Sequence, residues 1–258
     1  MRNNSTWALS ALSPTPWPRE AFNIPWTLLV AFGAVILGIV PGLVYVVVAA
    51  HLGFIDMRHL DRLPADQLLL AQVVTYAPLG AFLLFAVPRV ARVPAHELGL
   101  RTPTSRELGI GALGTIVMWL AVSLAGALVT AISHRHDTEN AVALLQSMKT
   151  PVQQILFFAI ACVLAPIIEE LTFRVFIFNA ISRYATIPVA IVASGCVFGI
   201  VHAASLPQLA TVGIPLAVGG MVLAVVYAAT RSYWASVTTH ALFNAISVIA
   251  IFVFHAKP

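Results

Sequence analysis

Six long stretches of the chain contain no Asp, Glu, Lys or Arg, and they constrain its fold more than any other feature. An α-helix needs about 20 apolar residues to cross the hydrocarbon of a bilayer. One of the stretches is long enough for two crossings, so the pattern predicts seven membrane-spanning helices, or eight if one region is divided further. The stretches are residues 21–55, 67–88, 108–134, 150–168, 184–230 and 232–256.

Composition supports this fold class. The chain is 60% hydrophobic and 9% charged, and its mean hydropathy is +0.93. These values are typical of a polytopic membrane protein, so we expect an all-α bundle of transmembrane helices. The basic residues are scattered between the apolar stretches and form no patch, which argues against a nucleic-acid partner.

The stretches divide the chain into three parts. Residues 1–20 are rich in Ser, Asn, Pro and Trp and lack the features of a cleaved signal peptide, so we expect an N-terminal arm with Trp7 and Trp17 near the headgroups. Residues 21–149 are expected to form three transmembrane helices. Residues 150–258 are expected to form a four-helix core that holds the catalytic centre.

A cluster of charged residues ends the fourth apolar stretch. Glu169, Glu170 and Arg174 lie directly after residues 150–168, on what we expect to be the same helix. Ionisable groups at membrane depth are expensive and usually mark a functional site. No Asp or Glu follows Glu170 in the sequence, so the rest of the chain offers this cluster only neutral or basic partners.

Polar or aromatic residues spaced by four recur in the last third of the chain. Residues four apart share one face of a helix, so each pair presents two side chains in one direction. An acid four residues before a base is also the favourable order for a helical ion pair. The pairs are Glu170 with Arg174, Phe198 with His202, and His240 with Asn244.

The spacing places Glu169 and His202 at one depth. Ala185 marks the expected turn between two antiparallel helices, and the two residues lie almost equally far from it in sequence. Since each helical residue rises about 1.5 Å, their side chains should lie at nearly the same level. His240 reaches that level if the fourth helix projects beyond the bilayer.

These residue types suit the hydrolysis of a peptide bond, which requires a water, a base and donors for the oxyanion. Glu169 and His202 could activate the water, and His240 and Asn244 each carry an N–H that could meet an oxyanion. Pro166 removes a helical hydrogen bond close by and could open the helix there.

The same residues resemble a known family, that of the CAAX protease and bacteriocin-processing (CPBP, or Abi) proteases, which includes the Ras-converting CAAX endopeptidases. Its three ordered motifs are similar to Glu169-Glu170-x-x-x-Arg174, Phe198-x-x-x-His202 and His240-x-x-x-Asn244. The resemblance covers roughly residues 150–250 and implies an intramembrane protease. By that resemblance Glu169 and His202 would activate the water, His240 and Asn244 would form the oxyanion hole, and Glu170, Arg174 and Phe198 would support the site.

Other interpretations of the site stay open. The charged residues could be a structural ion-pair group, His202 a helix–helix hydrogen bond, and Phe198 simple packing. Zinc bound by Glu169, His202 and His240 is the alternative to a metal-free site. We favour the metal-free site, because the sequence has no H-E-x-x-H motif and no second carboxylate that obviously orients the histidines.

Two other function classes also remain. A proton-coupled transporter could use Glu169 and His202 as a relay, although we find no clear inverted repeat. A non-catalytic scaffold or immunity protein could keep the motifs for folding. For a protease we expect a peptide or lipidated-protein substrate in the bilayer. The excess of Arg and Lys in alternate loops predicts a cytoplasmic N-terminus, in a membrane that we expect to be prokaryotic.

Overall fold

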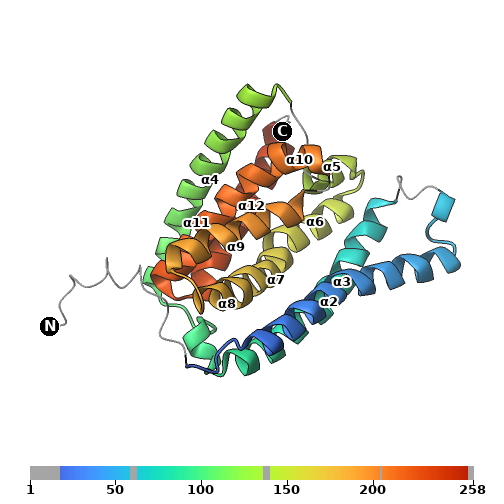
Figure 1. The fold of residues 1–258 in the computed structure, drawn as a ribbon. Coiled ribbons are helices and arrows are strands. Elements are labelled where there is room, and N and C mark those ends of the chain that lie inside the picture. The colour runs from blue at the N-terminus through green and yellow to red at the C-terminus, as the bar shows by residue number, and fades with distance from the viewer. Residues whose placement is uncertain (1–17, 59–62, 136–139, 204, 255–258) are drawn as a thin grey trace.

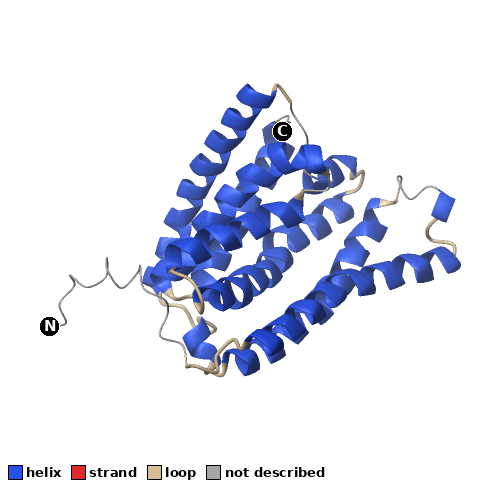
Figure 2. Ribbon diagram, viewed as in Figure 1, coloured by secondary structure: helices blue, strands red, loops and turns tan. Residues whose placement is uncertain are grey.

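The structure, a computed structural model, describes residues 18–58, 63–135, 140–203 and 205–254. Most of the expected N-terminal arm, including Trp7 and Trp17, lies outside these residues. The described residues form helices joined by short loops, with no β-strand among them (Figures 1 and 2). This confirms the all-α bundle that the apolar stretches predict.

The first half of the chain contributes three long helices, α2 (Ile24–His51), α3 (Ala65–Ala91) and α4 (Ser105–Ser133). A 3₁₀ turn, η2 (Ala95–Leu98), lies between α3 and α4. Helices α2 and α3 form a hairpin, whereas α4 packs against α11 and α12 on the opposite side of the bundle (Figure 1). The central helices of the bundle are therefore flanked by the hairpin on one side and by α4 on the other.

The fourth span, Pro151–Ser182, is one long helix with two π-helical segments. A short helix, α5 (Asn140–Ser147), precedes it. The span consists of α6 (Pro151–Ala159), the π-helical η3 (Ile160–Leu164), α7 (Ala165–Glu170), the π-helical η4 (Leu171–Phe178) and α8 (Asn179–Ser182).

The last helices begin after the turn predicted near Ala185. The turn near Ala185 leads into α9 (Ile187–His202), and the break near Ser205 separates α9 from the next span. That span consists of α10 (Leu206–Gln208), the π-helical η5 (Leu209–Gly213) and α11 (Ile214–Thr230), and α12 (Tyr233–Phe254) follows. In the part of the chain that the structure describes, six helical stretches are long and apolar enough to cross a membrane, and α9 is a shorter apolar helix.

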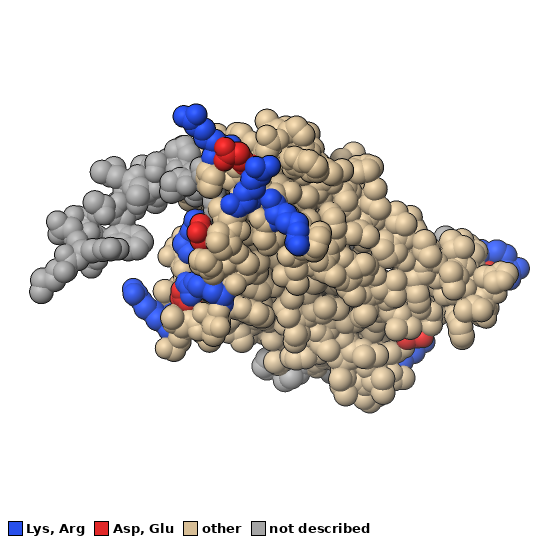
Figure 3. Space-filling model, turned by 90° about the horizontal axis from the view of Figure 1, so that it is seen from below, with Lys and Arg blue, Asp and Glu red and all other residues tan. Residues whose placement is uncertain are grey.

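The outer surface is that of a protein in lipid. Large apolar side chains such as Leu28, Phe32 and Val47 of α2 are exposed. On the face shown in Figure 3, charged residues gather toward the ends of the molecule and leave a broad surface without them in between. A broad apolar surface of this kind, on helices long enough to cross a membrane, suits contact with hydrocarbon.

Glycines bring α9 and α11 into backbone contact. A Cβ atom at Gly199 would lie 2.1 Å from the carbonyl oxygen of Gly213, and one at Gly195 would lie 2.9 Å from that of Ala217. Small residues at such crossings allow helices to pack closely in a membrane. This contact fixes the part of α9 that carries Phe198 and His202.

The turn between α8 and α9 is tied to the segment before α2. Arg183 Nε donates to the carbonyl oxygen of Ala21 at 3.3 Å, and the hydroxyl of Tyr184 donates to that of Phe22 at 2.8 Å. Phe22 is fully buried. These contacts hold the turn that sets the relative level of Glu169 and His202.

Candidate active site

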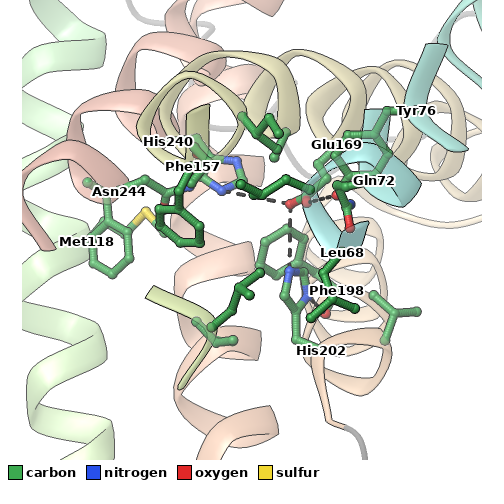
Figure 4. A pocket seen from close by; sticks show the side chains of 18 residues that line it. Leu68, Gln72, Tyr76, Met118, Phe157, Glu169, Phe198, His202, His240 and Asn244 are labelled. Carbon is green, nitrogen blue, oxygen red and sulfur yellow. Dashed lines mark hydrogen bonds and ion pairs between the residues drawn. The ribbon is translucent and has the colours of Figure 1, made fainter. Parts of the chain in front are cut away.

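Glu169, His202, His240 and Asn244 meet at one cavity inside the bundle (Figure 4). Glu169 lies on α7, His202 is the last residue of α9, and the other two lie on α12. The cavity has a volume of about 420 Å³. Its walls also include apolar side chains from six helices. They are Leu68 of α3, Met118 of α4, Phe157 of α6, Val201 of α9, Leu216 of α11 and Phe243 of α12, among others.

The carboxylate of Glu169 lies between two imidazole rings. Its Oε2 atom is 3.6 Å from His202 Nε2 and 3.8 Å from His240 Nε2. Both distances exceed those of a good hydrogen bond, so a small polar molecule can bridge the carboxylate and the rings. The other oxygen, Oε1, accepts a hydrogen bond of 2.7 Å from the hydroxyl of Tyr76 on α3.

The ring of His202 is oriented by its own helix. Its Nδ1 atom lies 2.7 Å from the carbonyl oxygen of Phe198, one turn earlier. Because a carbonyl oxygen only accepts, Nδ1 must carry a proton. In the neutral ring Nε2 is then the acceptor, and this is the atom that faces Glu169.

Glu170 is the centre of a buried polar network behind the cavity. The side chains of Glu170 and Arg174 are both fully buried, with Arg174 Nε 3.0 Å from Glu170 Oε2. The hydroxyl of Ser236 on α12 also donates to Oε2, and Arg174 Nη2 donates to the carbonyl oxygen of Gly220 on α11 at 3.0 Å. One carboxylate therefore links the fourth span to α12 and, through Arg174, to α11.

Glu170 also orients His240. Its Oε1 atom lies 2.9 Å from His240 Nδ1, so this nitrogen donates to the carboxylate and Nε2 points toward Glu169. The sequence-based expectation that no second carboxylate orients the histidines is therefore wrong for His240. The spacing could not show it, because Glu170 and His240 lie 70 residues apart.

Phe198 forms an aromatic wall under the site. It is 2% exposed, and its ring lies 4.4 Å from that of His202 and 5.7 Å from that of His240, measured between centroids. The guanidinium of Arg174 lies 5.0 Å from the same ring. Phe198 thus separates the buried ion pair from the cavity and limits the motion of both histidines.

Asn244 is anchored by the π-helical turn of η3. The N–H of Ala165 bonds the carbonyl oxygen of Ile160, five residues earlier, instead of that of Ala161. Pro166 has no N–H to offer. The carbonyl oxygen of Ala161 consequently accepts a 2.7 Å hydrogen bond from Asn244 Nδ2. A primary amide has two N–H donors, so one remains for a ligand in the cavity.

Sequence reasoning missed Tyr76, Ser236 and the carbonyl of Ala161. Ser236 could have been found, because it lies four residues before His240 and so on the same helix face. Tyr76 is a hydroxyl in an apolar stretch, which is a weak signal. Nothing in the sequence points to Ala161, since its carbonyl is freed by a local change of hydrogen-bond register.

The described residues contain no group of three or more His, Cys, Asp and Glu side chains arranged to hold a metal ion. This finding does not decide between the metal-free site and the zinc alternative at Glu169, His202 and His240. Metal independence itself stays a prediction that needs a chelator experiment.

The fold and the site together define a polytopic membrane protein with a cluster of polar side chains at a cavity between its helices. Residues 151–246 match a family model described as type II CAAX prenyl endopeptidase Rce1-like. The match of residues 151–246 agrees with the family that the motifs indicated and supports an intramembrane endopeptidase in general terms. All the residues expected in the site fall within the matched range. No curated protein and no solved structure matched the chain.

Proposed function

We propose that this protein hydrolyses a peptide bond within the membrane, using a water that Glu169 and His202 activate directly. The observation that carries the proposal is the position of Glu169 Oε2, which lies 3.6 Å and 3.8 Å from the Nε2 atoms of two histidines at the wall of one cavity. A water there can donate one hydrogen bond to Glu169 and one to the acceptor nitrogen of His202. Its lone pair then points into the cavity.

In the first step the water oxygen attacks the carbonyl carbon of the scissile bond and its proton passes to Glu169. The carbonyl oxygen becomes an oxyanion. One N–H of the Asn244 amide donates to the carbonyl oxygen of Ala161, which fixes the orientation of the amide. The second N–H can then donate to the oxyanion. In the second step the carbon–nitrogen bond breaks, and Glu169 returns the proton to the leaving amine.

His240 supplies the second donor when both of its nitrogens carry a proton. Its Nδ1 donates to the buried carboxylate of Glu170, and its Nε2 lies 3.8 Å from Glu169. An imidazole ring with both nitrogens protonated offers two N–H donors and no acceptor. In that form Nε2–H can donate to the oxyanion beside Asn244.

The substrate that fits this cavity is an apolar peptide segment held at the membrane, either lipidated or with its own transmembrane anchor. Apolar side chains form most of the wall, and the carboxylate of Glu169 lies between His202 and His240 within it (Figure 4). Apolar pockets of this kind bind chiefly by burying hydrocarbon, and a few polar groups fix the orientation of the ligand.

Cleavage by the purified protein in vesicles tests the proposal. We would use fluorogenic peptides with either a prenylated cysteine or a plain transmembrane anchor, and identify the products by mass spectrometry. Glu169→Gln and His202→Ala should each lower kcat roughly a hundred- to ten-thousandfold, since the first removes the group that takes the proton of the water and the second removes the acceptor that orients the water. In the same assay EDTA should leave activity unchanged.

Glu97 and His96 provide matched controls. They are the same residue types on the exposed η2 turn, so Glu97→Gln and His96→Ala should cleave at the wild-type rate. Wild-type cleavage by Glu169→Gln and His202→Ala would overturn the proposal. Activity that EDTA removes and zinc restores would replace the metal-free mechanism with a metal-dependent one.

A further inference from the structure

Tyr76 brings a fourth helix, α3, to the proposed reaction centre. Its hydroxyl donates a 2.7 Å hydrogen bond to Glu169 Oε1, and its side chain lines the cavity beside Gln72 (Figure 4). Tyr76 lies on α3, outside the matched range 151–246. The family motifs therefore assign it no role.

The packing of α3 on α7 holds Tyr76 at this distance. Gly80 lies one turn after Tyr76 on the same helix face, and a Cβ atom there would lie 2.4 Å from Cδ1 of Ile168. Ile168 directly precedes Glu169. The absence of a side chain at Gly80 lets α3 approach α7 at the level of the carboxylate.

We propose that Tyr76 is a positioning residue, which holds the carboxylate of Glu169 so that Oε2 faces the two histidines. The inference rests on the proposed function, in which Oε2 receives the proton of the water. The terminal side-chain torsion of a glutamate (χ3) has a broad distribution, so a carboxylate without a fixed partner samples many orientations. A hydrogen bond to Oε1 restricts that torsion and leaves Oε2 for the chemistry.

The hydrogen bond also matters because of its surroundings. The side chain of Glu169 is 14% exposed, and the neighbouring Phe198 and Leu68 are apolar. Hydrogen bonds to an ionised group are stronger than neutral ones, and more so where water is excluded. A donor lost here is not replaced as easily as one at a surface.

Tyr76→Phe removes the hydroxyl and keeps the ring, and Tyr45→Phe is its matched control. Tyr45 on α2 donates a 2.7 Å hydrogen bond to Gln67 Oε1 and is not among the residues that line the cavity. We expect Tyr76→Phe to lower kcat roughly ten- to a hundredfold and to leave KM within about twofold. Tyr45→Phe should leave both constants unchanged, and the thermal unfolding temperatures of the two variants should agree.

Wild-type kcat in Tyr76→Phe, or an equal loss in Tyr45→Phe, would overturn the inference. A rise in KM with unchanged kcat would also overturn it, because it would make Tyr76 a substrate-binding group. Glu169→Gln in the same assay separates this failure from that of the proposed function. If Glu169→Gln is inactive and Tyr76→Phe is fully active, only the role of Tyr76 is wrong.

Discussion

Among single residues, Glu170 constrains the geometry of the candidate active site most strongly. It is fully buried and contacts Arg174, Ser236 and His240. Burying a carboxylate is unfavourable unless its oxygens are paired and hydrogen-bonded. Each of its oxygens here has a partner, so the adjacent Glu169 is left as the carboxylate that faces the cavity.

Removing either partner of the buried ion pair should destabilise the protein strongly. Glu170→Ala and Arg174→Met each leave an uncompensated charge, which typically costs about 3–5 kcal/mol of unfolding free energy. The double variant should lose less than the sum, because neither charge then remains alone. Denaturant unfolding in detergent measures all three, with the exposed Glu97→Ala as the control. Additive losses would show that the two residues do not act as a pair.

Among the secondary-structure elements, the fourth span shows where sequence reasoning succeeds and where it ends. The turn near Ala185 and the shared level of Glu169 and His202 follow from helix rise and from charge-free stretches, which are local properties. The π-helical turn at η3 does not follow from them. Pro166 indicates that the helix could open there, but the contact of the Ala161 carbonyl with Asn244, 83 positions away, does not follow from any local property.

The crossing of α9 and α11 should tolerate no side chain at Gly199. A methyl group there would meet the carbonyl oxygen of Gly213 at 2.1 Å and the backbone nitrogen of Ala217 at 2.8 Å, and backbone atoms cannot rotate away. We expect Gly199→Ala to lower the unfolding temperature and to reduce activity by shifting His202.

Gly38→Ala is the control for this substitution. Gly38 lies within α2 and has nothing within 4 Å of its Cβ position, so alanine should be neutral or stabilise the helix slightly. Thermal unfolding in detergent compares the two variants. Equal unfolding temperatures would contradict the close crossing of α9 and α11.

For the whole molecule, the charge-free stretches were enough to predict a bundle of about seven apolar helices, because charged residues are excluded from hydrocarbon. The contact between α3 and α7 was not predictable in this way. Tyr76 and Glu169 are 93 residues apart, and helix periodicity does not reveal which helices become neighbours. The candidate active site is therefore complete only when α3, from the first half of the chain, packs against α7, from the second half.

We propose that the end of the bundle where α2 begins faces the cytoplasm. Arg89, Arg92, Arg101, Arg183 and Arg231 lie at or near the helix ends on that side, as the positive-inside rule requires. Among the basic residues on which this prediction rested, Arg2, Arg62 and Lys257 lie outside the described residues.

Cysteine labelling from outside the cell tests this orientation. Thr102 and Lys149 are exposed near opposite ends of the bundle, and both native cysteines can be replaced by serine. A membrane-impermeant maleimide should label Lys149→Cys and leave Thr102→Cys unlabelled. The reverse pattern would place the N-terminus on the outer side.

The most direct test of the central claim is the rate of a single turnover by Glu169→Gln, with enzyme in excess over a cleavable membrane peptide. The amide keeps the shape of the side chain but cannot take a proton from water, so the rate of bond cleavage should fall at least about a hundredfold while peptide binding is retained. A Glu169→Gln rate equal to that of the wild type would contradict the claim that this carboxylate activates the water.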